Sequence, residues 1–416
     1  MKQAFFLRSL VFVLALFVFV MPFASSCEKQ GVTQEETPPD ALSGVIDATP
    51  VGPTELGNPY VSYKPFEAYP MAKCIWELYE YGGKLYLGCG DGNNNTSPTL
   101  IYSYDPNADA YASFDFTGEV TEEWVDRFFV LDGKLGVLGA DPAVGTYGWD
   151  EGTYYTLGEA GWDVHVFHSG THTYDFVEYE GAHFIAKQTL YDGEPVIRSA
   201  DGGETWENVA MIKDGVRQIW EEGSYIRGEK FLTLNGKLYL YFYNTGKELG
   251  YKHFVYEYKD GAFHQLPYTW PQNLDIRSQM PNAASSRLEN AVEFGGKVYL
   301  VTGHLMATDD LSTIERVALP EACRVQDICV TDDTLYVMAS TQKELSSFET
   351  AVFATTDGET FECAARFSYP IPCYSFLPYG DKLYFGTGSS ALTETSAADH
   401  EKLGMLLSYP NLFKTE

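Results

Sequence analysis

A short hairpin phrase recurs along the chain and constrains its fold more than any other feature. In its clearest copy, Tyr79–Gly88, alternating apolar and polar residues run into two glycines, and a second strand opens with Lys84-Leu85-Tyr86. Alternating strands joined by two-residue Gly, Asn or Asp turns predict β-hairpins. The seven copies turn at Gly82, Gly133, Gly181, Gly236, Gly296, Asp333 and Gly380. Their spacing of roughly 50 residues predicts a repeat architecture.

The composition and the strands between these hairpins predict an all-β fold. Aromatic residues make up 15% of the chain, helical apolar periodicity is nearly absent, and a second strand pair follows each hairpin. Four strands per repeat predict a β-propeller of seven four-stranded blades across residues 57–416. A six-bladed ring is the alternative, because the fifth repeat is short. Open sheet edges invite aggregation, so the strand near Tyr60–Tyr63 is expected to pair beside Met405–Tyr409, making the N- and C-terminal segments share the closing blade.

The first 27 residues are predicted to be an export signal. Leu10–Val20 is an unbroken apolar run, and Ala24-Ser25-Ser26 lead to Cys27. This segment resembles a bacterial lipoprotein signal, which implies that Cys27 is lipidated; ordinary cleavage to a soluble product is the alternative. Residues 28–56 are rich in Glu, Thr, Pro and Gly and predict a flexible tether. We therefore expect an exported protein, on the bacterial cell surface or in the periplasm, attached to the membrane only through its lipid.

The net charge and the cysteines exclude several classes of partner. A formal net charge of −30 argues against nucleic acid and against an anionic membrane surface held by charge alone. Six cysteines follow Cys27, and their spacing has no zinc pattern, so they are expected to be small buried side chains with a disulfide or two as an alternative. No cofactor and no metal are predicted.

One turn carries a resemblance to a known family. Ser199, Asp201, Gly203, Thr205 and Trp206 have the spacing of an Asp-box, and residues 354–361 form a degenerate copy. The chain thus resembles the Asp-box, or BNR-repeat, sialidase-like β-propellers. In such a turn the Asp accepts backbone N–H bonds and the Gly permits positive φ, so Asp201 is expected to be structural. Asp-boxes occur in enzymes and in non-enzymes.

Polar residues recur at one register of the innermost strands. Arg227, Arg287 and Arg324 lie ten residues before the second hairpin strand on three consecutive blades, and three converging guanidiniums suit a carboxylate or sulfate. Three residues further along, every blade carries a polar residue, namely Glu77, Arg127, Asp175, Lys230, Asn290, Asp327 and Ser375. The alternative is structural: these side chains satisfy one another around a wet channel.

The predicted function is binding on this top face. The candidate ligand-binding residues are Arg227, Arg287, Arg324, Glu229, Arg127, Asp175, Trp149 and Trp270. The resemblance to sialidases implies an arginine triad with Tyr/Glu and Asp partners, and Asp126, Glu289 and Tyr374 are the catalytic candidates by position. The family's Arg-Ile-Pro motif is absent, however. The sequence therefore favours a surface lipoprotein that binds an acidic glycan or a protein partner, with a glycoside hydrolase acting on acidic sugars as the alternative.

Overall fold

The fold was analysed in a computed structural model. It describes residues 52–67, 69–91, 98–114, 122–142, 152–167, 172–190, 193–220, 225–244, 252–269, 290–389 and 395–413. These residues belong to one compact unit, Thr49–Glu416. The predicted signal, Cys27 and nearly all of the predicted tether lie outside them. Within the described ranges, no helix is long and apolar enough to cross a membrane.

All seven predicted hairpins are present, as the antiparallel pairs β2–β3, β7–β8, β12–β13, β18–β19, β22–β23, β26–β27 and β30–β31. Their turns need positive φ at the central residues, as at Asn235 (52°) and Gly236 (72°). Asp332 and Asp333 adopt the same left-handed backbone without a glycine, at 48° and 56°. The local turn chemistry therefore explains why the phrase repeats.

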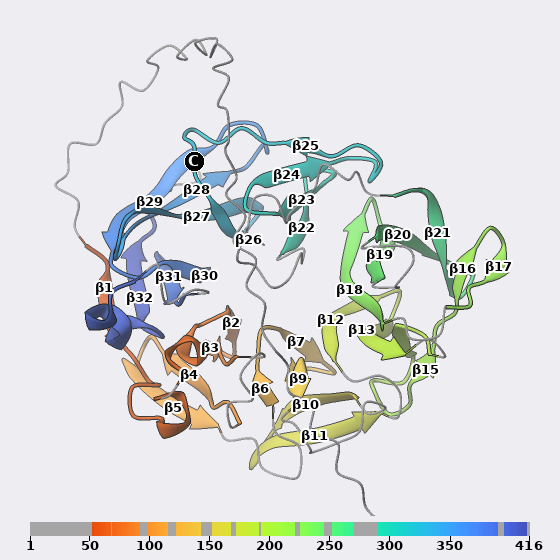
Figure 1. Cartoon of the computed structure of the whole chain (residues 1–416), viewed down its shortest axis with the longest axis horizontal. Helices are drawn as coiled ribbons and strands as arrows, with labels where there is room; N and C mark the ends of the chain where they lie inside the picture. Colours follow the sequence, from red (N-terminus) through yellow and green to blue (C-terminus); the bar gives the residue numbers. More distant parts are fainter. Residues whose placement is uncertain are drawn as a thin grey trace, which may run out of the picture. The chain divides into compact units, whose positions relative to one another are not determined.

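Five four-stranded sheets surround a central axis (Figure 1). The first contains β2 (Glu77–Tyr81), β3 (Lys84–Gly88), β4 (Ile101–Asp105) and β5 (Ala110–Phe114). The second contains β7 (Phe128–Leu131), β8 (Lys134–Leu138), β10 (Gly152–Gly158) and β11 (Gly161–Phe167), and the short pair β6 (Glu122–Trp124) and β9 (Asp141–Pro142) lies apart from it. Two further sheets contain β22 (Ala291–Phe294), β23 (Lys297–Val301), β24 (Leu305–Thr308) and β25 (Glu315–Arg316), and β26 (Val325–Thr331), β27 (Thr334–Glu344), β28 (Ser347–Thr355) and β29 (Glu362–Tyr369).

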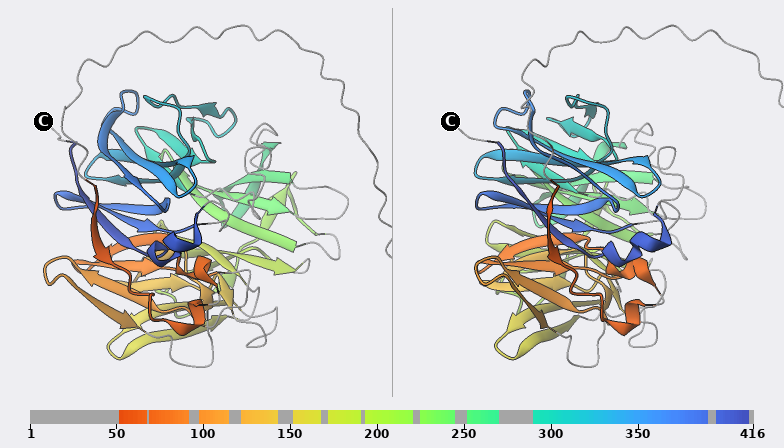
Figure 2. Two further views of the ribbon diagram at one scale, coloured as in Figure 1. Left: turned by 60° about the vertical axis from the view of Figure 1, so that its left-hand side comes forward. Right: turned by 90° about the vertical axis from the view of Figure 1, so that its left-hand side faces the viewer.

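The fifth sheet closes the ring with both ends of the chain, as predicted. It contains β1 (Thr54–Gly57), β32 (Leu406–Pro410), β31 (Lys382–Thr387) and β30 (Cys373–Tyr379). The strand β1 lies beside the dark blue β32 in Figures 1 and 2. The expected strand near Tyr60–Tyr63 was wrong, because β1 begins at Thr54, inside the predicted tether. Tyr60 is instead buried, and its hydroxyl donates to the Leu87 carbonyl at 3.3 Å.

The remaining strands form one ten-stranded sheet, so neither seven nor six separate blades are present. It contains β12 (Thr173–Tyr179), β13 (Ala182–Leu190), β14 (Val196–Ser199), β15 (Glu207–Asn208), β16 (Met211–Lys213), β17 (Val216–Arg217), β18 (Tyr225–Leu234), β19 (Lys237–Asn244), β20 (Lys252–Lys259) and β21 (Ala262–Thr269). Two four-stranded meanders, β12–β15 and β18–β21, are joined because the ends of β13 and β18 pair at Gln188–Arg227 and Leu190–Tyr225. The prediction of seven separate blades was therefore wrong, and the structure has five.

Short 3-10 turns and apolar cores complete the unit. The turns are η1 (Lys64–Phe66), η2 (Pro70–Lys73) and η4 (Ala397–Lys402). Buried aromatic and aliphatic side chains pack between neighbouring sheets, as where Tyr86 of β3 meets Phe128 of β7. The six cysteines from Cys74 to Cys373 are free thiols, so the disulfide considered from the sequence is not formed.

The Ser199–Trp206 turn has the hydrogen bonds expected of it. The Asp201 carboxylate accepts from the Thr205 backbone N–H at 2.9 Å and from the Ser199 hydroxyl at 2.7 Å. These bonds, led by the Thr205 hydroxyl, lower the pKa of Asp201 to about 2. Trp206 is half-buried and packs edge-on against Tyr154, with ring centroids 5.7 Å apart. Asp201 is therefore a structural residue.

The sequence analysis missed a third turn of this kind, between β24 and β25. Asp310 accepts from the backbone N–H groups of Ser312 at 2.8 Å and Thr313 at 2.9 Å. Leu311 stands where the other turns have glycine, with φ at 60° and its side chain buried. The glycine and the aromatic residue are absent, so the only sequence signal was the Thr308-x-Asp310 spacing.

Replacing Asp333 should stabilise the fold. Its side chain is exposed and its φ of 56° is costly for any residue with a Cβ, so Asp333→Gly should raise the free energy of unfolding by about 0.5–1 kcal/mol. Urea denaturation measures the change. Gly296→Ala, at φ 75°, should shift stability in the opposite direction. A loss of stability in Asp333→Gly would contradict the strain.

Candidate functional site

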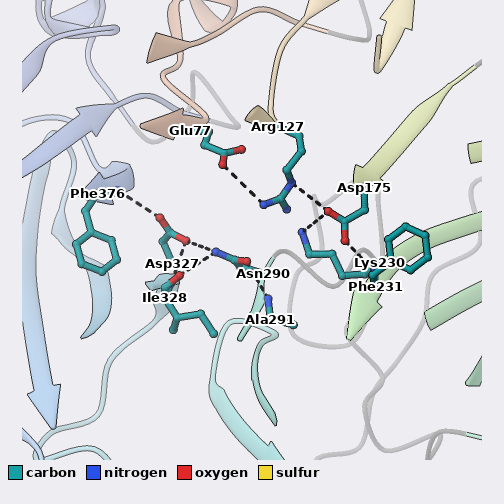
Figure 3. Close-up of polar contacts among 10 residues, drawn as sticks. All are labelled: Glu77, Arg127, Asp175, Lys230, Phe231, Asn290, Ala291, Asp327, Ile328 and Phe376. Atoms are coloured by element: carbon teal, nitrogen blue, oxygen red, sulfur yellow. Dashed lines mark hydrogen bonds and ion pairs between the residues drawn. The ribbon is translucent and has the colours of Figure 1, made fainter. Parts of the chain in front are cut away.

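The seven predicted polar positions include a connected set in the channel. Figure 3 shows Glu77, Arg127, Asp175, Lys230, Asn290 and Asp327 converging from successive innermost strands. We call these six residues, with Ser375, the channel ring. Their convergence confirms that one register of the repeat faces the axis.

Two carboxylates of the channel ring connect neighbouring innermost strands. Asp175 of β12 accepts from the backbone N–H of Phe231 in β18 at 2.8 Å. Asp327 of β26 accepts from the backbone N–H of Phe376 in β30 at 3.3 Å and from its own neighbour Ile328 at 2.8 Å. Each carboxylate therefore satisfies a buried backbone donor of the next strand, a structural role that the sequence analysis did not consider.

Asn290 and Ser375 continue these connections. The Asn290 amide donates to Asp327 and to the Ile328 carbonyl, both at 2.9 Å, and its oxygen accepts from the Ala291 N–H. The Ser375 hydroxyl donates to the Ile75 carbonyl at 2.8 Å, which ties β30 to the chain entering β2. The hydrogen-bonding groups of Asn290 are thereby engaged.

Arg127 and Lys230 make looser contacts. The Arg127 guanidinium lies 3.7 Å from Glu77 and 3.5 Å from Asp175, and the Lys230 ammonium lies 3.8 Å from the same Asp175 oxygen. These are ion-pair distances, longer than the charge-assisted hydrogen bonds of 2.7–2.9 Å. Lys230 is only 5% exposed, so its charge is held largely out of water.

Burial dominates the titration of the channel ring. It raises the pKa of Glu77 to about 8, against the attraction of Arg127, and raises the pKa values of Asp175 and Asp327 to about 6 each. Burial disfavours the charge on Arg127, but Glu77 and Asp175 outweigh it and raise the guanidinium pKa. At neutral pH the two cations thus face two ionised carboxylates and a protonated Glu77.

β-bulges interrupt four innermost strands just before the channel ring, at Tyr174, Glu229, Gln326 and Tyr374. Ordinary strand alternation would point these residues away from the face their neighbours share. A bulge re-aims a side chain, so two successive residues can approach the channel. We call these four residues, with Arg227 beside Tyr174 and Trp76 beside Tyr374, the mouth.

Arg227 is the mouth's most distinctive residue. Its guanidinium lies 5.8 Å from the centre of the Tyr174 ring, in a cation–π contact, and its Nε is buried without a hydrogen-bond partner. Tyr174 donates to Gln188 at 3.1 Å and stacks on His172, with centroids 6.1 Å apart. Among the described residues, no carboxylate lies within ion-pair distance of Arg227. A half-buried guanidinium without a counterion is suited to an anion.

Aromatic side chains occupy another part of the mouth. Trp76 packs edge-on against Tyr374 at 5.3 Å and against Trp124 at 6.1 Å, and its indole N–H donates to the Gly90 carbonyl. Asp126 is half-buried nearby, and its charge contributes to the raised pKa of Glu77. The catalytic candidate Tyr374 thus packs against Trp76, whereas Asp126 lies close enough to Glu77 to influence its charge.

The other predicted residues divide into two groups. Glu229 is buried, and Arg324 is half-buried beside β26, where its backbone N–H donates to the Thr341 hydroxyl. Arg287, Glu289, Trp149 and Trp270 lie outside the described residues. The sequence analysis did not select His172, Tyr174 or Gln188; Tyr174 shares its register with Tyr374, which was the available signal. Within the described ranges, no group of three or more potential metal ligands is present.

Comparisons with known proteins found similar structures but no similar sequences. No family model and no curated protein matches the chain. Among solved structures, it is similar to virginiamycin B lyase from Staphylococcus aureus, with 11% identity over 76% of this chain and 93% of that one and a TM-score of 0.44. It is also similar to polysaccharide lyase Uly1, with 10% identity over 82% of this chain and 91% of that one and a TM-score of 0.45. The β-propeller domain of the Trilobed protease from Pyrococcus furiosus has 10% identity over 75% of this chain and 90% of that one, with a TM-score of 0.42. These likenesses concern the β-propeller fold alone.

Removing the Glu77 carboxyl should change the pH dependence of stability. Its pKa rises from 4.5 in the unfolded chain to about 8, so the folded protein holds the proton longer. This contribution is fully present below pH 4.5 and is lost as the pH rises to 8. Between pH 5 and pH 8, the free energy of unfolding of Glu77→Gln should rise relative to that of wild type by on the order of 2–4 kcal/mol. Melting temperatures across this range measure it.

The matched control is Glu362→Gln, at an exposed carboxyl of β29. It should follow the wild-type profile. A Glu77→Gln profile parallel to wild type would show that Glu77 is ionised in the folded protein.

Proposed function

We propose that this chain is a surface binding protein whose mouth recognises a glycan bearing a single carboxylate. The observation that carries the proposal is the guanidinium of Arg227 over Tyr174, whose Nε is buried without a hydrogen-bond partner and which meets no carboxylate among the described residues. A guanidinium binds a carboxylate through two parallel hydrogen bonds, and the aromatic groups beside it suit the apolar face of a sugar ring.

The net charge restricts the ligand further. At a net charge of −30, the protein repels polyanions over the distance of a Debye length. A glycan with one carboxylate on an otherwise neutral sugar loses little to this repulsion and gains the contact with Arg227. Sialic or uronic acid units fit this description better than densely sulfated chains.

Glycoside hydrolysis has no comparable support. A glycosidase needs two carboxyl groups at a set separation, or a tyrosine nucleophile with its partners. Glu289 lies outside the described residues, and Tyr374 packs against Trp76 rather than beside Arg227. Binding is therefore the function we propose.

Replacing Arg227 should weaken glycan binding. The probes are 3′-sialyllactose and a disaccharide containing one uronic acid, each compared with its neutral parent by calorimetry. Arg227→Gln should bind the acidic sugar roughly ten- to a hundredfold more weakly than wild type, because it loses a pair of charged hydrogen bonds. Arg198→Gln is a matched control, because Arg198 also lies over an aromatic ring, at 5.9 Å, but pairs with Glu207. Equal binding of acid and neutral parent, or equal binding by wild type and Arg227→Gln, would contradict the proposal.

Membrane attachment is the second part of the proposed function, and it rests on the sequence around Cys27. Cys27→Ser should move the protein from the membrane fraction to the soluble fraction, because acyl chains supply the affinity. Fractionation and immunoblotting measure the shift. If the variant stays in the membrane fraction, the run Leu10–Val20 anchors the chain without cleavage.

A further inference from the structure

The channel ring is linked at every step among the described residues except one. Arg127 lies 3.7 Å from the Glu77 carboxyl and 3.5 Å from Asp175, and Asp175 in turn contacts Lys230. Hydrogen bonds then join Asn290 to Asp327, Asp327 to β30, and Ser375 to the start of β2. Between Lys230 of β18 and Asn290 before β22, no ion pair or hydrogen bond is formed within the described ranges.

A cavity of about 530 Å³ opens at this interruption. The charged side chains of its lining are Arg127, Lys230, Asp175 and Glu293, and Asn290 adds an amide. Phe231, Val292 and Val298 contribute apolar wall. This size lies within the range of small-molecule sites, which are apolar with a few polar groups that set orientation. The cavity is therefore large enough for an organic molecule.

The two cations retain hydrogen-bonding capacity toward this cavity. Arg127 carries five N–H donors and Lys230 carries three. Their contacts with Glu77 and Asp175, at 3.5 to 3.8 Å, are longer than charge-assisted hydrogen bonds, and the Arg127 Nε is buried without a hydrogen-bond partner. Both nitrogen atoms also approach one Asp175 oxygen, so a second acceptor placed between them would meet two donors at once.

We propose that this cavity binds a small organic carboxylate, separately from the mouth. Its carboxylate lies between Arg127 and Lys230, and its apolar body lies along Phe231 and Val298. A cation is disfavoured there, because Asp175 already faces two positive side chains. A neutral polar molecule can accept from both cations, but a carboxylate forms stronger, charge-assisted hydrogen bonds with them. The other carboxylate of the lining, Glu293, accepts from the Asn235 backbone N–H.

The test is calorimetry of the full chain in a carboxylate-free buffer. The probes are acetate, benzoate and 3-phenylpropionate, each against its primary amide, which keeps the shape and removes the charge. At least one acid should bind with a dissociation constant at or below about 1 mM, and its amide should bind at least about tenfold more weakly. Benzoate and 3-phenylpropionate should bind more tightly than acetate, because their bodies contact the apolar wall.

Two variants separate this site from other anion binding. Lys230→Met should weaken the binding of the acid at least about tenfold. Lys237→Met makes the same change at an exposed lysine of the same sheet and should bind as wild type does. If Lys230→Met does not fold, Ala291→Leu, which narrows the cavity without changing its charges, should weaken the binding of benzoate and 3-phenylpropionate more than that of acetate. The proposal is overturned if no acid binds at roughly 10 mM, if amides bind as well as acids, or if the folded variants bind as wild type does.

Discussion

Two innermost strands, β18 and β30, each have a backbone donor beside the channel that bonds to none of the strands they pair with. Unpaired buried N–H groups are costly, so a partner has to come from the neighbouring strand around the axis. Asp175 and Asp327 supply it, accepting from the backbone of Phe231 and Phe376. Because these bonds connect different strands of the ring, the closure of the fold depends on carboxylates that lie largely out of water.

That arrangement has an electrostatic consequence. Carboxylates placed around one channel repel one another, and burial adds to the cost of their charge. Arg127 and Lys230 compensate Asp175, while Glu77 compensates nothing further and keeps its proton to about pH 8. The scaffold therefore brings cations into the channel for its own stability, and any cation that stays incompletely paired becomes available to a ligand. A binding site can therefore form from charges that the fold first needs for its own stability.

Local sequence patterns predicted the hairpins of the fold better than they predicted which strands pair between blades. A turn such as Asn235-Gly236 predicts a hairpin because these residue types readily adopt positive φ. The alternation of side chains along a strand predicted that Asp175 and Asp327 face the channel. The fusion of β13 with β18 depends on strand lengths and on partners far apart in sequence, which no local pattern specifies. The same holds for the bulges before Asp175 and Lys230, which moved Tyr174 and Glu229 into the mouth. The turn at Asp310 escaped notice because Leu311 adopts a backbone that usually requires glycine.

The mouth and the channel ring differ in how their cations are held, and this difference bears on what each can bind. Arg227 is restrained by an aromatic ring and meets no described carboxylate, so an incoming anion has nothing to displace. Lys230 and Arg127 share Asp175, so an anion between them competes with a carboxylate that also holds the backbone of β18. Because that carboxylate cannot move without releasing Phe231, the ligand has to add to the cluster rather than replace part of it. A compact carboxylate can do so within the cavity, whereas a bulky glycan is suited only to the mouth.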